Sequence, residues 1–277
     1  MRGHSLLKTG TFILKLRFMM KKLLMLLAGS CLIACGSGPK PDFHENIVIA
    51  HRGAWKAKSL PENSIAALEE AIRIGCHGSE FDIHISSDDS LVVNHDPEYF
   101  GMVIADTPFR ELRTRRLSNG ERIPTAREYL LAGLDQDKTK LILEIKQSEN
   151  KQRTLELTRK AVELVEELDA RNMVGYITFD YDAGMLVRQL DPEAEVAYLN
   201  GDVTPEKAKE DGYTGLDYHY SLYRKNPQWI PKAHELGMTI NAWTVNSVPE
   251  MQHLIDQGAD YITTNEPELL LSLLRKQ

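Results

Sequence analysis

The chain has 277 residues, of which 42% are hydrophobic and 26% are charged, an ordinary globular composition with enough residues for one sizeable core. Residues 1–34 hold six of the 33 Lys and Arg residues and no acid, so the remainder carries 27 basic and 40 acidic residues, about −13. This balance argues against nucleic acid as a partner, and an anionic ligand would need locally placed positive charge.

Residues 1–34 have the features of a secretory signal peptide, in which Lys21 and Lys22 precede an apolar run too short to span a membrane stably. The ending Leu-Ile-Ala-Cys35 resembles a bacterial lipobox, so we expect Cys35 to become a lipidated N-terminus and residues 35–45 to form a tether. Plain cleavage, with Cys35 a bystander, is the alternative. Residues 1–18 could be an over-extended start before Met19 or Met20. The expectation is an exported, membrane-anchored lipoprotein, periplasmic or on the cell surface.

From residue 46 to 277, short apolar runs alternate with segments of helical period. Strands are predicted at 47–50, 79–84, 141–145, 174–179, 195–199, 214–218, 239–243 and 260–264. Helices are predicted at 64–74, with Asn63 as N-cap, and near 124–134, 151–169, 182–190, 204–210, 226–236, 248–257 and 266–275. Eight strand–helix units predict one (β/α)8 TIM barrel over residues 46–277, with a doubly wound open sheet as the alternative.

One segment interrupts the alternation. Residues 91–94 follow the second strand after only five residues, a spacing that suits a hairpin better than a helical crossover. We therefore expect 85–120 to be a short hairpin and loop insertion after strand two, on the face of a barrel where active sites lie.

Ionisable residues gather at the ends of the first three predicted strands. They are His51, Arg52, Glu80, Asp82, His95, Asp96, Glu144 and Lys146. Glu80 and Asp82 share one strand face, as do Glu144 and Lys146. Converging carboxylates repel one another and are costly to bury, so Glu80, Asp82 and Glu144 predict one divalent cation, Mg²⁺ or Ca²⁺. Salt bridges inside a barrel are the alternative.

Two histidines beside such a site, His51 and His95, suit general acid–base work. Arg52 and Lys146 offer donors for phosphate oxygens. Together these residues indicate metal-assisted cleavage of a phosphate diester.

Six segments in this order resemble the glycerophosphodiester phosphodiesterases, from about residue 47 to 270. They are His51-Arg52-Gly53, Pro61-Glu62-Asn63-Ser64, Glu80-Phe81-Asp82, Val92-Val93-Asn94-His95-Asp96, Leu143-Glu144-Ile145-Lys146 and Ala242-Trp243-Thr244-Val245-Asn246. The resemblance implies a barrel of the phospholipase C-like phosphodiesterase type. It also implies hydrolysis of a small-molecule glycerophosphodiester to sn-glycerol 3-phosphate and an alcohol.

The resemblance also implies roles. Glu80, Asp82 and Glu144 would hold the metal, and His51 and His95 would be the acid–base pair. Arg52 and Lys146 would contact the phosphate, and Trp243 would line the pocket, unless Trp243 is an ordinary core aromatic. The attack at phosphorus would be in line, with the neighbouring glycerol hydroxyl a candidate nucleophile.

Two other functions stay open. One is a phospholipase D-like or phosphoinositide-cleaving enzyme that acts on intact lipids. The other is a non-catalytic binding lipoprotein, which would be expected to lack a ligand or a histidine of the set. The sequence departs from the family pattern at 75–79, at 86–89 and at Asn265, where Asp is common, and none of these is expected to touch the catalytic set.

Overall fold

The structure is a computed structural model that describes residues 40–276. The expected signal peptide, Cys35 and the first part of the tether lie outside the described residues. Within residues 40–276, no helix combines the length and the apolar character needed to cross a membrane.

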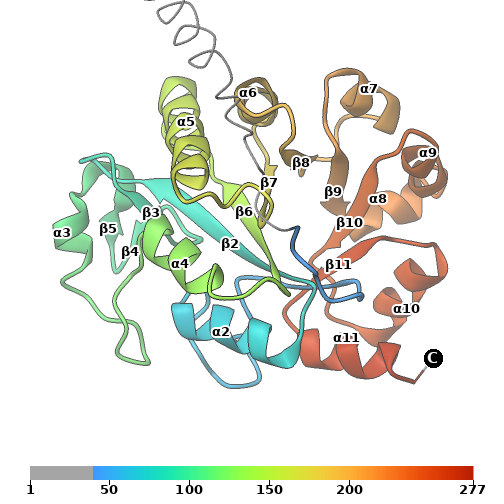
Figure 1. Ribbon diagram of the computed structural model, residues 1–277, viewed down its shortest axis with the longest axis horizontal. Helices are drawn as coiled ribbons and strands as arrows, with labels where there is room; N and C mark the ends of the chain where they lie inside the picture. The colour runs from blue at the N-terminus through green and yellow to red at the C-terminus, as the bar shows by residue number, and fades with distance from the viewer. Residues whose placement is uncertain (1–39, 277) are drawn as a thin grey trace, which may run out of the picture. The chain divides into compact units, whose positions relative to one another are not determined.

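The described chain forms a closed parallel barrel (Figure 1). Its strands are β1 (Val48–Ala50), β2 (Gly78–Ile85), β6 (Lys140–Ile145), β7 (Val174–Thr178), β8 (Glu195–Tyr198), β9 (Gly215–His219), β10 (Thr239–Trp243) and β11 (Tyr261–Thr264). Each pairs in parallel with its neighbour, and β1 pairs with both β11 and β2, which closes the ring. The predicted barrel is confirmed, and the open sheet is excluded because an open sheet leaves two edges unpaired.

Helices follow the barrel strands and lie outside them in Figure 1. They are α2 (Ile65–Ile74), α4 (Ala126–Gly133), α5 (Lys151–Glu167), α6 (Tyr181–Leu190), α7 (Pro205–Glu210), α8 (Tyr220–Lys225), α9 (Trp229–Glu235), α10 (Val248–Asp256) and α11 (Pro267–Leu274). The prediction that Asn63 caps α2 is wrong. Ser64 is the N-cap, because its Oγ accepts the Ala67 N–H at 3.1 Å, which leaves the Asn63 side chain available for another contact.

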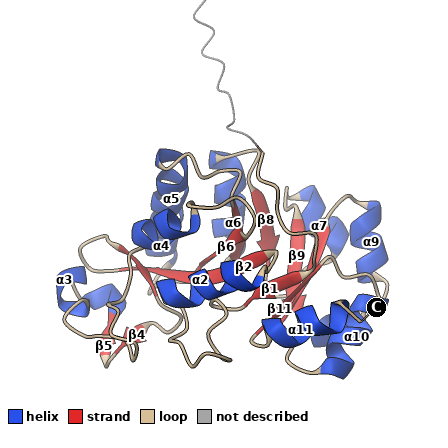
Figure 2. Cartoon of the chain, turned by 60° about the horizontal axis from the view of Figure 1, so that its bottom comes forward, coloured by secondary structure: helices blue, strands red, loops and turns tan. Residues whose placement is uncertain are grey.

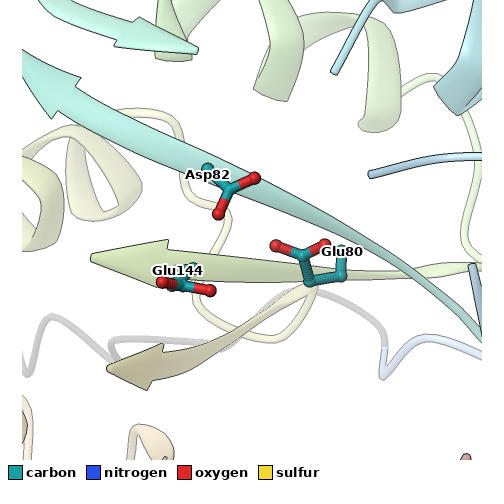
Figure 3. Close-up of side chains that lie close together, drawn as sticks. All are labelled: Glu80, Asp82 and Glu144. Carbon is teal, nitrogen blue, oxygen red and sulfur yellow. The ribbon is translucent and has the colours of Figure 1, made fainter. Parts of the chain in front are cut away.

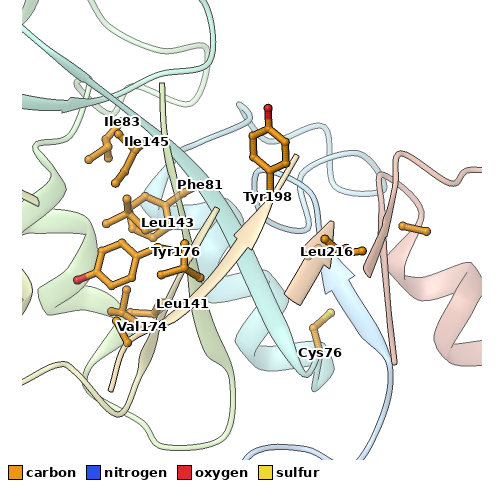
Figure 4. Close-up of a cluster of buried hydrophobic side chains, with 14 of the residues drawn as sticks. Cys76, Phe81, Ile83, Leu141, Leu143, Ile145, Val174, Tyr176, Tyr198 and Leu216 are labelled. Atoms are coloured by element: carbon orange, nitrogen blue, oxygen red, sulfur yellow. The ribbon is translucent and has the colours of Figure 1, made fainter. Parts of the chain in front are cut away.

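Alternation along β2 and β6 separates apolar from charged side chains. One set packs into the layer between strands and helices shown in Figure 4: Phe81, Ile83, Leu141, Leu143 and Ile145. Burial of each such side chain stabilises the fold by roughly 1.5–3 kcal/mol. The alternate residues, Glu80, Asp82 and Glu144, consequently point into the barrel.

The insertion after β2 carries more structure than a loop. Strand β3 (Leu91–Val93) runs antiparallel to β2, which confirms the predicted hairpin. Beyond it lie the hairpin β4 (Glu98–Tyr99) and β5 (Met102–Val103), the short η1 (Ile104–Asp106) and α3 (Phe109–Leu112), visible at the left of Figure 2. They share a small core of Val92, Tyr99, Ile104, Leu112 and Ile123.

Candidate active site

Three carboxylates from two adjacent strands converge inside the barrel (Figure 3). Glu80 and Asp82 come from β2 and Glu144 from β6, and one oxygen of each lies within 4.8 Å of the others. The register pairs Asp82 directly with Glu144. All three side chains are buried.

The oxygens of this cluster are poorly satisfied by the protein. Glu80 Oε1 has no hydrogen-bond partner within residues 40–276. Asp82 Oδ1 and Glu144 Oε1 have only ion-pair contacts with Lys146 Nζ, at 3.2 and 2.8 Å. Buried anionic oxygens without donors are strongly unfavourable, and oxygen ligands are those that Mg²⁺ and Ca²⁺ prefer. The cluster therefore fits a divalent cation.

The pKa values of the three carboxyl groups in the absence of a metal show the same unfavourable burial of charge. Burial, reinforced by Asp82 and Glu144, raises the pKa of Glu80 well above its ordinary value. Burial and then Asp82 raise the pKa of Glu144 to about 7. Burial alone would also raise the pKa of Asp82, but Lys146, His95 and Arg52, together with the hydrogen bond from Asn63, outweigh it and hold that pKa below the ordinary value. Asp82 is therefore the carboxylate that the protein keeps ionised without help from a metal.

Arg52 is placed by the sharp turn that ends β1. Its φ is 58°, and its backbone N–H donates to Glu80 Oε2 at 2.8 Å. Its Nη1 donates to both carboxylate oxygens of Glu62, at 2.9 and 3.0 Å, and its Nε lies 3.8 Å from Asp82 Oδ2. Gly53 follows with φ 83°, and a Cβ there would lie 2.6 Å from the backbone of Ala67, so the turn requires glycine.

Asn63 supports the cluster from behind. Its Nδ2 donates to Asp82 Oδ2 at 2.8 Å, and its Oδ1 accepts the Asp82 backbone N–H at 3.2 Å. Its φ is 57°, a left-handed conformation that Asn tolerates better than most residues. The two reciprocal bonds fix the orientation of the Asp82 carboxylate.

His51, at the end of β1, is held by Asn265. Its Nδ1 lies 2.8 Å from Asn265 Oδ1, an oxygen that can only accept, so Nδ1 carries the proton and Nε2 is free, 4.0 Å from Glu80 Oε2. Burial lowers the pKa of His51 to about 4. The expectation that Asn265 does not touch the catalytic set is wrong. Strand β11 pairs with β1, so the residue that follows β11 lies beside His51 at the end of β1.

His95 is fixed from two sides after β3. Its Nδ1 lies 2.7 Å from Asp96 Oδ1, which orients the ring. Its backbone carbonyl accepts a hydrogen bond from Nε2 of the buried His84, two residues beyond Asp82 on β2, at 3.0 Å. The insertion hairpin is thus tied to the strand that carries two of the carboxylates.

A cavity of about 120 Å³ joins these groups. Its charged lining comes from β1, β2, the β3 loop and β6: His51, Arg52, Glu80, His95, Glu144 and Lys146. Its apolar lining comes from the opposite half of the barrel, at β7, β8 and β10: Ile177, Phe179, Leu199 and Trp243. The indole N–H of Trp243 donates to the Asp217 carbonyl at 2.8 Å, and its ring contacts Phe179 edge-on.

Every residue predicted from the sequence for the site, apart from Cys35 and Asp82, lines this cavity. Asp82 contacts Lys146 and pairs in register with Glu144, and both of these residues do line it. Sequence reasoning missed Asn63, His84 and Asn265 as supports, and it missed Asp217 in the lining. Two signals were available: Asn63 lies in the Pro61–Ser64 motif, and Asn265 stands where the family pattern commonly has Asp. His84 and Asp217 depend on contacts that the sequence does not mark.

A closed barrel with a buried carboxylate cluster, two oriented imidazoles, and Arg52 and Lys146 at the carboxyl ends of its strands has the groups that a metal-assisted hydrolase needs. The sequence model of the Glycerophosphoryl diester phosphodiesterase family matches residues 51–269. The chain belongs to this family, and it is a phosphoric diester hydrolase.

Similar proteins agree with this assignment. The chain is 27% identical to a glycerophosphodiester phosphodiesterase of Caldanaerobacter subterraneus, over 84% of this chain and 99% of that one. A solved glycerophosphodiester phosphodiesterase from Parabacteroides distasonis is 40% identical, with a TM-score of 0.82, covering 84% of this chain and 98% of that one. A phosphodiesterase from Oleispira antarctica, 24% identical with a TM-score of 0.72 over 83% and 97% of the two chains, was solved with sn-glycerol 3-phosphate.

Proposed function

We propose that this protein hydrolyses glycerophosphodiesters to sn-glycerol 3-phosphate and an alcohol, with two histidines as acid and base. The observation that carries the proposal is the meeting, in one cavity, of the carboxylate cluster with both imidazoles and with Arg52 and Lys146. The product in the Oleispira structure is the one that this reaction would release.

Glu80, Asp82 and Glu144 would hold one divalent cation, Mg²⁺ or Ca²⁺. When bound, that ion supplies positive charge to the phosphate oxygens. Arg52 and Lys146 add positive charge on the same side of the cavity, so the phosphate is oriented toward β1, β2 and β6.

His51 suits the base, since its buried ring is neutral near pH 7 and its free Nε2 faces the cavity. The hydroxyl next to the phosphate ester loses its proton to His51 as its oxygen bonds to phosphorus. The bond from phosphorus to the departing alcohol breaks, and His95 protonates that oxygen. Water then opens the cyclic phosphate with the two histidines in reversed roles.

The test is release of glycerol 3-phosphate from a panel of glycerophosphodiesters, with EDTA and then with added Mg²⁺ or Ca²⁺. Activity that survives thorough chelation would remove the metal from the proposal. We expect His95→Ala to lose about 10²–10⁴-fold in kcat. Near wild-type turnover of glycerophosphocholine by this variant would show that His95 is not the acid.

Phosphodiesterase action on intact lipids, phospholipase D-like or phosphoinositide-cleaving, is the second candidate. One observation favours it: Phe100 and Val103 of the insertion are 61% and 39% exposed, an apolar feature near the His95 loop. Equal kcat/KM on acylated and deacylated substrates would support it. The small cavity favours the deacylated substrate.

We also propose that the protein is exported and anchored through a lipid on Cys35. The support is the lipobox-like sequence that ends in Cys35, the basic and apolar segment before it, and the tether-like residues 36–39 after it. Metabolic labelling with palmitate tests this proposal. Loss of label and release from membranes on Cys35→Ala are expected, whereas an unlabelled wild-type protein would indicate plain cleavage.

A further inference from the structure

Asp217 is a buried acid that the proposed chemistry does not use. It lies on β9 between Leu216 and Tyr218, which pack into the layer under the helices, so its side chain points into the barrel. It is 1% exposed and lines the cavity that holds the histidines and the carboxylate cluster.

The protein satisfies this carboxyl group only in part. Within residues 40–276 its Oδ1 has no hydrogen-bond partner and the side chain forms no ion pair, although the carboxyl interacts with the side chain of Asn241, its neighbour on β10. Lys146, the cation that serves the cluster, contacts Asp82 and Glu144 instead. Burial raises the pKa of Asp217 to about 8, so near neutral pH the group is largely protonated and can both donate and accept.

The cavity wall beside Asp217 is largely apolar, with Asn241 as its polar neighbour on β10 and Thr244 and Thr263 also in the lining. Its neighbours in the cavity come from the flanking strands β8 and β10, where Leu199 and Trp243 lie. The indole of Trp243 is fastened to the Asp217 backbone, so this half of the cavity is held rigidly. A few convergent polar groups in a largely apolar wall are the usual means by which a pocket binds a hydroxyl of its ligand, and Asp217 has a free oxygen for this contact.

We infer that Asp217 is a specificity-determining residue that binds the terminal hydroxyl of the substrate's glycerol moiety. The inference rests on the proposed function, because it takes the phosphate to lie against Arg52 and Lys146 in the opposite half of the cavity. The hydroxyl next to the phosphate is used in the reaction, so the terminal one is left for Asp217.

Two substrates test the inference. Glycerophosphocholine has the terminal hydroxyl, and 2-hydroxypropyl phosphocholine lacks it but keeps the neighbouring hydroxyl and the leaving group. We expect the wild-type kcat/KM to favour the first by at least about tenfold. Asp217→Leu should lose about 10–100-fold on glycerophosphocholine and keep its rate on the analogue, and Asp217→Asn should be intermediate.

Stability and metal affinity separate this role from a structural one. Asp217→Asn and Asp217→Leu should unfold at the wild-type temperature or higher, because they remove a buried carboxyl whose Oδ1 has no hydrogen-bond partner. The control is Asp191→Asn, another buried acid, which contacts Arg171 outside the cavity; it should lower the unfolding temperature and leave the substrate ratio unchanged. An unchanged ratio in Asp217→Leu, or equal loss on both substrates with weaker Mg²⁺ or Ca²⁺ binding, would overturn the inference.

The affinity for the product tests the role of Asp217 without any requirement that the protein catalyse the proposed reaction. By calorimetry, the wild type should bind sn-glycerol 3-phosphate at least about tenfold more tightly than propane-1,2-diol 1-phosphate, and Asp217→Leu should bind the two alike. A wild type that turns over neither diester but shows this preference would refute the proposed function and support the role of Asp217. Equal wild-type binding of both phosphates would refute that role.

Discussion

The support that Asn63 gives to Asp82 predicts a large effect from a residue that touches no substrate. Asn63→Gly removes both hydrogen bonds but keeps the left-handed backbone at φ 57°. The bond to the ionised carboxylate is worth about 1.5–3 kcal/mol, and the orphaned Asp82 N–H costs about 1–3 kcal/mol. We expect a loss of about 3 kcal/mol in the free energy of unfolding, or roughly 6–12 °C in melting temperature.

The same substitution frees the Asp82 carboxylate to rotate, so affinity for Mg²⁺ or Ca²⁺ should fall about 10–100-fold. Thermal unfolding at a fixed scan rate and calorimetric titration with the metal measure the two effects. Ser64→Ala is the matched control, because it removes the N-cap of α2 at the adjacent residue. It should lower the free energy of unfolding by about 1 kcal/mol and leave metal affinity unchanged. Wild-type metal affinity in Asn63→Gly would refute the reasoning.

Three further predictions concern the same cavity. The pKa of Glu144 rises from an ordinary 4.5 to about 7 on folding, so its contribution makes the metal-free protein less stable as pH rises through that window. Glu80, whose pKa is also raised, contributes in the same direction, so Glu144→Gln should reduce the slope of unfolding free energy against pH measured with EDTA, and an unchanged slope would show that Glu144 does not contribute. Asn265→Asp places a carboxylate against His51, which raises the pKa of that base and should move the acid limb of the kcat/KM profile to higher pH; an unmoved limb would exclude His51 as the base. His84→Leu removes the donor to the His95 carbonyl and should lower kcat about tenfold at unchanged metal affinity, whereas a wild-type kcat would show that the carbonyl needs no anchor.

Most of the barrel was predictable because its signals are local. Apolar runs of strand length, separated by amphipathic helices, specify the order of elements, and each predicted barrel strand overlaps an observed one. The misses have local causes. Helix α8 begins at the residue after β9 ends, so no turn residue separates the two elements in the sequence, and the 85–120 insertion builds its own small core instead of following the barrel's repeat. Ser64, not Asn63, caps α2 because the Asn63 side chain is taken by Asp82.

The sequence by itself determined the carboxylates, histidines and cations of the candidate site, since charged residues at the ends of apolar strands are conspicuous and the barrel brings those ends together. Only the tertiary structure decided which of them are supported, and by what. Asn265 reaches His51 because β11 closes the ring against β1, 214 residues away in sequence. Asp217 became distinctive only when its burial in the cavity wall and its unpaired Oδ1 were known. Such contacts depend on barrel closure, which no local pattern in the sequence encodes.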